Sequence, residues 1–352
     1  MPNAILTRAI DALASRRDLS ADEAAEVLAE IMSGEVSETQ IAGFLIALRT
    51  KGESVDEVAG LARTMRSLAA HVPTEREDLL DTSGTGGGRG TFNVSTTAAL
   101  IAAGAGCAVA KHGNRSATSR SGSADVLEAL GARIDLDPEG VAACIEEAGF
   151  GFMFAPAHHQ ATRFVVPVRR DLAVRTIFNL LGPLTNPAGA RRQLIGVSDP
   201  SFLETVAGAL ARLGVDRALV VCSEDGLDEI SIEAATKVVE VNGEEVSRYT
   251  LVPSDVGVEL AGEGGRDSRA GAGTPQENAA VTRAILEGAL GPDSDLAAIN
   301  AGAAIYAAGG VGTIAEGVEA ARTALREGSA AESLERYVKA SERHAPTAGA
   351  PR

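Results

Sequence analysis

The sequence is poor in aromatic residues: its 352 residues include no tryptophan, three tyrosines and eight phenylalanines. Hydrophobic residues still make up 45% of the chain, which is ample for a core, and alanine, glycine and valine dominate them. A core of small side chains favours helices packed closely on a sheet. At this length we expect one large domain with an appendage, or two domains.

Cysteine is also scarce. Cys107, Cys144 and Cys222 lie far apart, with no Cys-x-x-Cys pair and no histidine at metal-ligand spacing. The pattern therefore indicates neither a disulfide framework nor a zinc site. We expect three small, buried thiols in a reducing compartment.

Basic residues are fewer than acidic ones: the chain has 32 Lys and Arg and 48 Asp and Glu, which gives a formal net charge of −16. This balance disfavours nucleic acid as a partner, so any bound anion must be held by local groups. The sequence also lacks the apolar core of a signal peptide and any apolar run of about 18 residues, the length that crosses a membrane. We expect a soluble cytoplasmic protein with no membrane partner.

The first 70 residues carry a helical pattern. Three serines stand three residues before a glutamate or glutamine, which is the capping-box spacing at a helix start: Ser20 with Glu23, Ser37 with Gln40, and Ser54 with Glu57. Apolar residues at helical spacing follow each of them. We interpret residues 1–70 as a helical unit with a structural or dimerising role.

After residue 71 short apolar runs alternate with helical patterns, which predicts a mostly parallel sheet covered by helices. The predicted strands include 107–110, 133–136, 150–154, 193–197 and 218–222, and residues 236–251 are predicted to form a hairpin around Asn242-Gly243. The glycine-rich stretch 261–276 is predicted to be a mobile loop. In such sheets, ligands bind at the carboxyl ends of the strands.

Residues 81–125 contain the densest polar motifs. Glycines at 84, 86, 87, 88 and 90 can adopt positive φ and approach a ligand closely, and short polar side chains surround them. A second polar segment, Lys111-His-Gly-Asn-Arg115, follows after one apolar stretch. Two polar loops flanking one buried strand indicate a ligand with two separated anionic groups.

Two further segments concentrate charge. Arg163, Arg169, Arg170 and Arg175 lie within thirteen residues and invite an anionic ligand, although one or two of them should pair with surface carboxylates. Glu224-Asp-Gly-Leu-Asp-Glu229 is an acidic turn, whose adjacent carboxylates would repel unless they are solvated or bridged by a cation such as Mg²⁺. On spacing alone, a solvated turn is the simpler interpretation.

Four motifs in this order resemble the anthranilate phosphoribosyltransferase family: the glycine loop, Lys111-His-Gly-Asn-Arg115, Arg175-Thr-Ile-Phe-Asn-Leu-Leu-Gly-Pro-Leu-Thr-Asn-Pro187 and Gly226-Leu-Asp-Glu229. The resemblance spans roughly residues 5 to 340. It implies transfer of phosphoribose from phosphoribosyl pyrophosphate to the amine of anthranilate, in tryptophan biosynthesis. It also implies a small all-helical lobe on a large α/β domain, and a homodimer formed through that lobe.

With this family's architecture, the helical lobe comprises residues 1–70 and is completed by helices around 168–188. The α/β domain then comprises 71–167 and 189–345, and a disordered tail covers 346–352.

The resemblance also implies roles for individual residues, with none assigned as a general base. Phosphoribosyl pyrophosphate would contact Gly84, Gly87, Gly88, Thr91, Asn93, Val94, Ser95, Thr96, Lys111, His112, Gly113, Asn114, Arg115, Ser119 and Ser123. Anthranilate would contact Gly84, Asn114, His159 and Arg169. Two Mg²⁺ ions per monomer would be held by Ser95, Asp228 and Glu229.

Two positions depart from the family pattern. Gly-Thr-Gly-Gly is usually followed by Asp and Gly, whereas Gly88-Arg89-Gly90 follows here and leaves the loop one residue shorter, without that acid. Gln160 stands where the family commonly has proline. The first departure changes the charge of the loop. It also affects a contact that the family's acid would make near the ribose or the pyrophosphate.

Two alternatives share the predicted fold. A pyrimidine nucleoside phosphorylase would carry Lys-His-Ser-Thr-Gly-Gly where this chain has Lys111-His-Gly-Asn-Arg115. A noncatalytic nucleic-acid-binding relative is disfavoured by the acidic charge and by the joint presence of Ser95, Asp228 and Glu229.

Overall fold

The computed structural model describes residues 2–116, 120–259 and 273–346. Ser119, most of the predicted loop 261–276, and all of the predicted tail except residue 346 lie outside these ranges. Within them, no helix combines the length and the apolar character needed to cross a membrane.

Four helices form the amino-terminal lobe: α1 (Ala4–Ala14), α2 (Ala21–Ser33), α3 (Glu38–Lys51) and α4 (Val55–Ser67). Ser20 and Ser54 begin α2 and α4 with complete capping boxes, as the spacing predicts. Ser37 caps α3, but the Gln40 side chain does not reach back to it. Gln40 instead accepts from Asn3 N at 2.9 Å and donates to Asn3 O at 3.0 Å, so it links the starts of α1 and α3.

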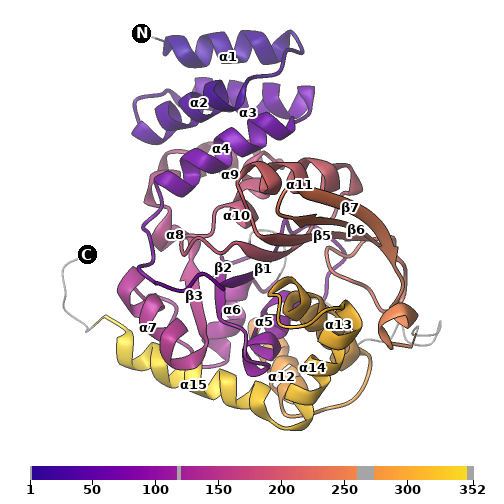
Figure 1. The fold of residues 1–352 in the computed structure, drawn as a ribbon. Coiled ribbons are helices and arrows are strands. Elements are labelled where there is room, and N and C mark those ends of the chain that lie inside the picture. Colours follow the sequence, from indigo (N-terminus) through magenta and orange to yellow (C-terminus); the bar gives the residue numbers. More distant parts are fainter. Residues whose placement is uncertain (1, 117–119, 260–272, 347–352) are drawn as a thin grey trace.

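Seven strands form one sheet in the order β3-β2-β1-β4-β5-β6-β7 (Figure 1). They are β1 (Leu80–Gly84), β2 (Val109–Gly113), β3 (Phe150–Phe154), β4 (Arg192–Gly196), β5 (Arg217–Ser223), β6 (Thr236–Asn242) and β7 (Glu245–Leu251). Strands β1 to β5 are parallel, whereas β6 and β7 form the predicted antiparallel hairpin. The predicted fold class, a helical lobe on a mostly parallel α/β domain, is confirmed.

Two predicted strands differ from the observed structure. Strand β2 begins at Val109 and continues through Lys111 and His112 to Gly113, so three residues assigned to a polar loop belong to the sheet. Residues 133–136 form no strand. Their backbone is held at the carboxyl end of a helix instead, where Arg133 N donates to Ser341 Oγ at 3.0 Å.

Helices cover both faces of the sheet (Figure 1). Besides the lobe, the α-helices are α5 (Val94–Gly104), α6 (Ser123–Ala129), α7 (Pro138–Ala148), α8 (Ala155–His158), α9 (Val166–Leu172), α10 (Phe178–Leu184), α11 (Leu203–Arg212), α12 (Pro275–Leu286), α13 (Pro292–Ala307), α14 (Ile314–Arg326) and α15 (Ser329–His344). In the described parts of the chain, three short 3₁₀ helices cover Gln160–Phe164, Pro200–Phe202 and Pro253–Val256.

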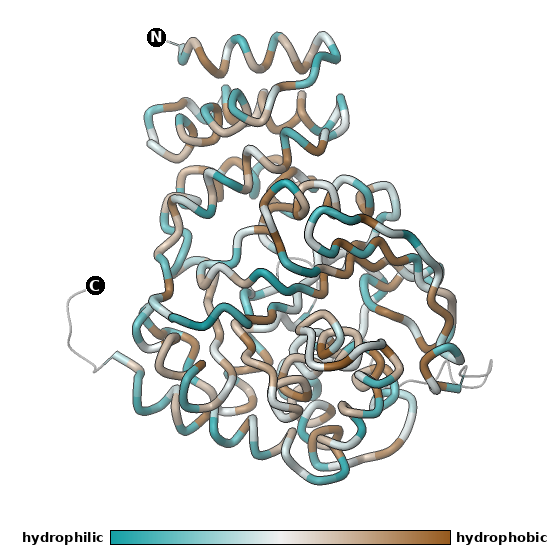
Figure 2. Tube along the Cα trace, viewed as in Figure 1, coloured by the Kyte–Doolittle hydropathy of each residue, from teal (hydrophilic) through white to brown (hydrophobic). Residues whose placement is uncertain are grey.

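Strand β5 separates two hydrophobic cores. Leu219 and Val221 face the core that holds α5, α7 and α12 to α15, whereas Ala218, Val220 and Cys222 face a core shared with the lobe, α9, α10 and α11. Figure 2 shows hydrophobic colouring along β5 and β6 and mixed colouring on outer helices such as α15. The lobe is therefore anchored by a core that continues onto one face of the sheet.

The ligand-binding edge follows from the strand order. The chain leaves β1 towards β2 and β3 on one side, and then crosses to β4 and β5 on the other side of β1. Sheets with such a reversal bind ligands in the crevice outside the carboxyl ends of the strands at that point. The last residues of β1 and β4, Gly84 and Gly196, are paired there.

Candidate active site

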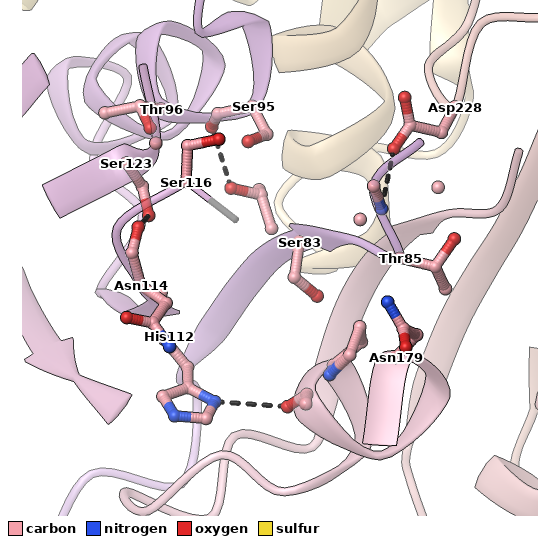
Figure 3. A pocket seen from close by; sticks show the side chains of 18 of the residues that line it. Ser83, Thr85, Ser95, Thr96, His112, Asn114, Ser116, Ser123, Asn179 and Asp228 are labelled. Atoms are coloured by element: carbon pink, nitrogen blue, oxygen red, sulfur yellow. Dashed lines mark hydrogen bonds between the residues drawn. The ribbon is translucent and has the colours of Figure 1, made fainter. Parts of the chain in front are cut away.

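A cavity of about 430 Å³ opens at this edge of the sheet (Figure 3). Of the residues predicted from the sequence, it is lined by Gly84, Gly87, Asn93, Ser95, Thr96, Lys111, His112, Gly113, Asn114, Arg115, Ser123, Arg169, Asp228 and Glu229. Gly88, Thr91, Val94 and His159 do not line it, and Ser119 lies outside the described residues. Segments separated by more than a hundred residues thus meet around one space.

The glycine loop lies between β1 and α5. Gly86 and Gly87 adopt φ of +68° and +83°, conformations that favour glycine. Gly87 also lies against the Arg175 guanidinium, and Arg175 Nη2 donates to Gly86 O and to Ser198 Oγ. Backbone amides of such a loop can bind an anion without a mobile side chain.

The first turn of α5 adds partners for an anion. Its amides carry the positive end of the helix dipole, and Ser95 and Thr96 lie in that turn beside the cavity (Figure 3). Thr96 Oγ1, Ser83 Oγ and Glu229 Oε2 are buried and have no hydrogen-bond partner among the described residues, and all three residues line the cavity. Buried polar atoms are rarely left unpaired, so these three atoms suit the polar groups of a ligand.

Lys111 is buried behind the loop, with 1% of its surface exposed. Its Nζ donates to Thr82 O at 2.6 Å and, more weakly, to Thr82 Oγ1 at 3.3 Å and Ser95 Oγ at 3.4 Å. Burial lowers the pKa of Lys111 to about 8, against the opposing effect of Asp81 and Glu229. The cation therefore lies within reach of a phosphate bound at the start of α5.

Asp81 is the buried counterpart of this lysine. Its carboxylate accepts from Asn186 Nδ2 at 2.8 Å and from His112 N at 3.1 Å. Burial raises the pKa of Asp81 to about 6, although Lys111 and the hydrogen bonds lower it. The opposite charge of Asp81 explains why Lys111 can be buried on β2.

The acidic turn after β5 places the carboxylates of Asp228 and Glu229 on the cavity wall. Figure 3 shows Asp228 across the cavity from Ser123 and Asn114. Asp228 Oδ2 accepts from Gly86 N at 3.1 Å, so the turn contacts the glycine loop directly. Burial raises the pKa of Asp228, and burial together with Asp228 and Asp225 raises the pKa of Glu229 well above its usual value. A cation would relieve this repulsion and would give Glu229 Oε2 a partner.

The arginine cluster separates in space. Arg169 and Arg175 line the cavity, whereas Arg170 pairs with Asp171 at 3.4 Å and Arg163 lies over the Phe164 ring. Arg169 forms no ion pair with a described carboxylate, burial lowers its pKa, and its guanidinium lies 5.4 Å from the centre of the Phe178 ring. It is thus a half-buried cation available to an anionic ligand.

Two histidines lie against each other below the cavity. His112 lines it and donates from Nδ1 to Gly182 O at 3.1 Å, and burial lowers its pKa to about 3. His159 lies 5.0 Å away, centre to centre, donates from Nε2 to Thr185 O, and has a pKa lowered to about 4 by burial. His159 thus supports His112 from behind. Its neighbour Gln160 is exposed at the start of a 3₁₀ helix.

Several lining residues were not assigned to the site from the sequence: Phe178, Asn179, Gly182, Gly196 and Asn300. Gly196 is the most restrictive of them, because a Cβ there would lie 1.6 Å from Asp228 O. The sequence signal for this role is a glycine at the end of a buried strand, where another backbone segment can approach closely. The sequence does not show that this segment is the acidic turn.

Family models match the chain in two parts. A model described as the glycosyl transferase family, helical bundle domain, matches residues 7–69, and one described as the glycosyl transferase family, a/b domain, matches residues 76–331. The chain therefore belongs to a glycosyl transferase family that has an amino-terminal helical bundle domain.

Relatives narrow this class. Anthranilate phosphoribosyltransferases from Rubrobacter xylanophilus and Thioalkalivibrio sulfidiphilus are 51% and 50% identical, over 96% and 95% of this chain and 98% of each relative. The solved enzyme from Thermus thermophilus superposes with a TM-score of 0.89 at 48% identity, covering 95% of this chain and 99% of that one. The chain belongs to the anthranilate phosphoribosyltransferase family, which confirms the predicted resemblance.

A more distant structure carries ligands. Anthranilate phosphoribosyltransferase from Saccharomyces cerevisiae, in complex with phosphoribosyl pyrophosphate and Mg, superposes with a TM-score of 0.87 at 27% identity. The match covers 97% of this chain and 99% of that one.

Proposed function

We propose that the chain transfers the 5-phosphoribosyl group of phosphoribosyl pyrophosphate to the amine of anthranilate, with release of pyrophosphate, in tryptophan biosynthesis. The observation that carries this proposal is the convergence of four features on one cavity: the glycine loop, buried Lys111, the start of α5, and the pair Asp228 and Glu229. The first three suit a pyrophosphate, and the pair suits the metal that accompanies it.

The donor is held mainly by backbone amides and short side chains. The first turn of α5 binds the pyrophosphate with Gly87 beside it, since the amides of Thr85 and Gly86 already donate to Gly196 O and Asp228 Oδ2. Lys111 adds a fixed charge behind Ser95. Asn114 and Ser123, which hydrogen-bond to each other through Asn114 O, lie on the opposite wall and reach the ribose phosphate. Arg115 is engaged by Asp125 and Glu128, so we assign it the role of holding this wall in place.

The residues at the cavity suit Mg²⁺, and our proposal includes two ions per monomer. Ser95, Asp228 and Glu229 supply oxygen ligands. The described residues contain no cluster of three His, Cys, Asp or Glu side chains that could hold a metal ion. Phosphate oxygens of the donor therefore complete the set of ligands, as is typical of Mg²⁺ sites. When bound, the metal neutralises charge that develops on the departing pyrophosphate.

The acceptor lies beside Arg169, which pairs with the carboxylate of anthranilate. The neutral amine attacks the anomeric carbon; the C–N bond forms as the C–O bond to pyrophosphate breaks, with inversion and oxocarbenium character. An aromatic amine is neutral at pH 7, so no strong base is needed and none is assigned. The proton lost from nitrogen passes to pyrophosphate or to water.

Loss of anthranilate fluorescence tests the activity most directly. We expect the signal to fall only when phosphoribosyl pyrophosphate and Mg²⁺ are both present, and to stay constant when either is omitted. A constant signal under all conditions, with turnover of thymidine and phosphate instead, would favour the nucleoside phosphorylase alternative.

Arg169→Ala is expected to raise the KM for anthranilate by about 30-fold and the KM for the donor by less than about threefold, since a charged hydrogen bond contributes about 1.5–3 kcal/mol. Steady-state kinetics with each substrate varied measures both. Arg170→Ala is the matched control, because Arg170 is the next residue of α9 but is exposed and does not line the cavity. Equal losses for both substrates would contradict the assigned role.

We also propose a homodimer formed through the lobe, which comprises residues 1–70, α9 and α10, and a cytoplasmic location in which the three free thiols stay reduced. Among the described residues the exposed large hydrophobic side chains include Ile46 on α3, Val166 at the start of α9 and Val174 two residues beyond its end, and α3 packs against α9. Exposed apolar side chains on helices that pack together suit a protein interface.

Ile46→Glu is expected to weaken the dimer at least about tenfold, because it buries a charge in an apolar contact. Sedimentation equilibrium would then show monomer at concentrations where the wild type is dimeric. Leu290→Glu introduces the same charge at a fully exposed leucine away from the lobe, and should leave the dimer intact. A wild type that sediments as a monomer would rule the proposal out.

A further inference from the structure

The glycine loop of this chain lies directly on the acidic turn. Arg89 N donates to Gly226 O at 2.8 Å, and Gly86 N donates to Asp228 Oδ2 at 3.1 Å. Gly88 lies between these two contacts, where a Cβ would meet Asp228 Oδ1 at 2.7 Å and Gly226 O at 2.9 Å. The shortened loop therefore uses a glycine to approach the turn at van der Waals distance.

Arg89 joins the same two segments through its side chain. Its Nη2 lies 3.0 Å from Glu233 Oε2 and its Nη1 lies 3.4 Å from Asp225 Oδ2. The two carboxylates are mostly buried, with 17% and 14% of their side chains exposed. Ser231 supports both, because its Oγ donates to Asp225 Oδ2 at 2.8 Å and accepts from Glu233 N at 2.9 Å.

The charge of Arg89 matters at this position. Asp225, Asp228, Glu229 and Glu233 are four of the five carboxylates between residues 224 and 233, beside the site where a highly anionic pyrophosphate binds. Arg89 contacts two of the four. Without Arg89, these carboxylates would repel the pyrophosphate, and they would also repel one another.

We propose that Arg89 is a positioning residue for the donor: it fastens the glycine loop to the acidic turn and offsets two of its carboxylates, so that the pyrophosphate meets loop amides already in place. The loop of this chain, one residue shorter than the family pattern and without its acid, is held by this ionic contact. The inference rests on the proposed function only in naming phosphoribosyl pyrophosphate as the donor.

Arg89→Gln is expected to raise the KM for phosphoribosyl pyrophosphate about five- to tenfold, because partly exposed ion pairs and local charge contribute modestly to binding. The kcat and the KM for anthranilate should stay within about twofold. Arg89→Lys, which keeps the charge but reaches one carboxylate, should give an intermediate KM for the donor. Arg133→Gln is the control, since Arg133 forms a similarly exposed ion pair with Asp135 beside α15.

A second readout needs neither substrate nor metal. Amide hydrogen exchange in peptides covering residues 84–91 should be several-fold faster in Arg89→Gln and also in Glu233→Gln, because both break the same contact. Exchange elsewhere and in Arg133→Gln should match the wild type. Unchanged loop exchange in both variants, or equal effects on the two KM values, would overturn the proposal. A wild type that does not consume anthranilate would instead sink the proposed function, while the exchange result would still decide whether Arg89 holds the loop.

Discussion

A Glu229→Gln variant is expected to lose at least about 100-fold in kcat/KM while its melting temperature without Mg²⁺ equals or exceeds that of the wild type. The loss follows from removing an anionic oxygen at the site where charge must be stabilised as pyrophosphate departs. The equal or higher stability follows from burial: Glu229 Oε2 has no hydrogen-bond partner in the part of the chain that the structure describes, and burial raises the pKa of this carboxyl well above its usual value. A carboxyl whose pKa is raised by folding destabilises the folded state at neutral pH. Replacing Glu229 therefore does not lower the free energy of unfolding of the ligand-free protein.

Thermal melting with and without ligands separates these two effects. Mg²⁺ with phosphoribosyl pyrophosphate should raise the melting temperature of the wild type and should fail to raise that of Glu229→Gln, because only a ligand that binds the folded state stabilises it. Glu224→Gln changes an exposed carboxylate at the start of the same turn, and should behave as the wild type in both assays. A Glu229→Gln variant that is less stable than the wild type without ligand would assign Glu229 to the fold rather than to the metal.

Local signals in the sequence predicted much of this fold. The serine caps of α2 and α4, the hairpin β6–β7 and the alternation of strands and helices each depend on residues close together in the chain. Gln40 departs from its local pattern because Asn3, 37 residues away, offers two backbone groups. The prediction of strand 133–136 was wrong for a related reason: its apolar residues Ile134 and Leu136 are buried, but its backbone bonds to α15.

Lys111 marks a limit of prediction from local sequence. A lysine followed by histidine, glycine and asparagine indicates a loop, and the structure extends β2 through the lysine because Asp81 and Thr82 on the neighbouring strand satisfy it. The motif residues that line the cavity could be predicted, since each belongs to a recognisable segment. Gly196 could not, because its role depends on the backbone of Asp228, a residue distant in the sequence that lies against it.

Gly196→Ala is expected to abolish detectable turnover and to destabilise the protein by about 3 kcal/mol. The added Cβ would lie 1.6 Å from Asp228 O and 2.6 Å from Asp228 C, both backbone atoms, so no side-chain rotation can relieve the clash. Either β4 or the acidic turn must move. Movement of β4 breaks its pairing with β1 and β5, whereas movement of the turn displaces Asp228 and Glu229 from the cavity.

Urea unfolding and steady-state kinetics on the same preparation distinguish these two responses. A large loss of stability with some remaining activity would mean that the sheet yields, and a loss of activity with near-normal stability would mean that the turn yields. Gly310→Ala is the matched control, because a Cβ there meets no atom within 4 Å and its φ is not positive. That substitution should change the free energy of unfolding by less than about 1 kcal/mol. If Gly196→Ala behaved like Gly310→Ala, the acidic turn could not lie across the end of β4, and the assignment of Asp228 and Glu229 to the metal would fall with it.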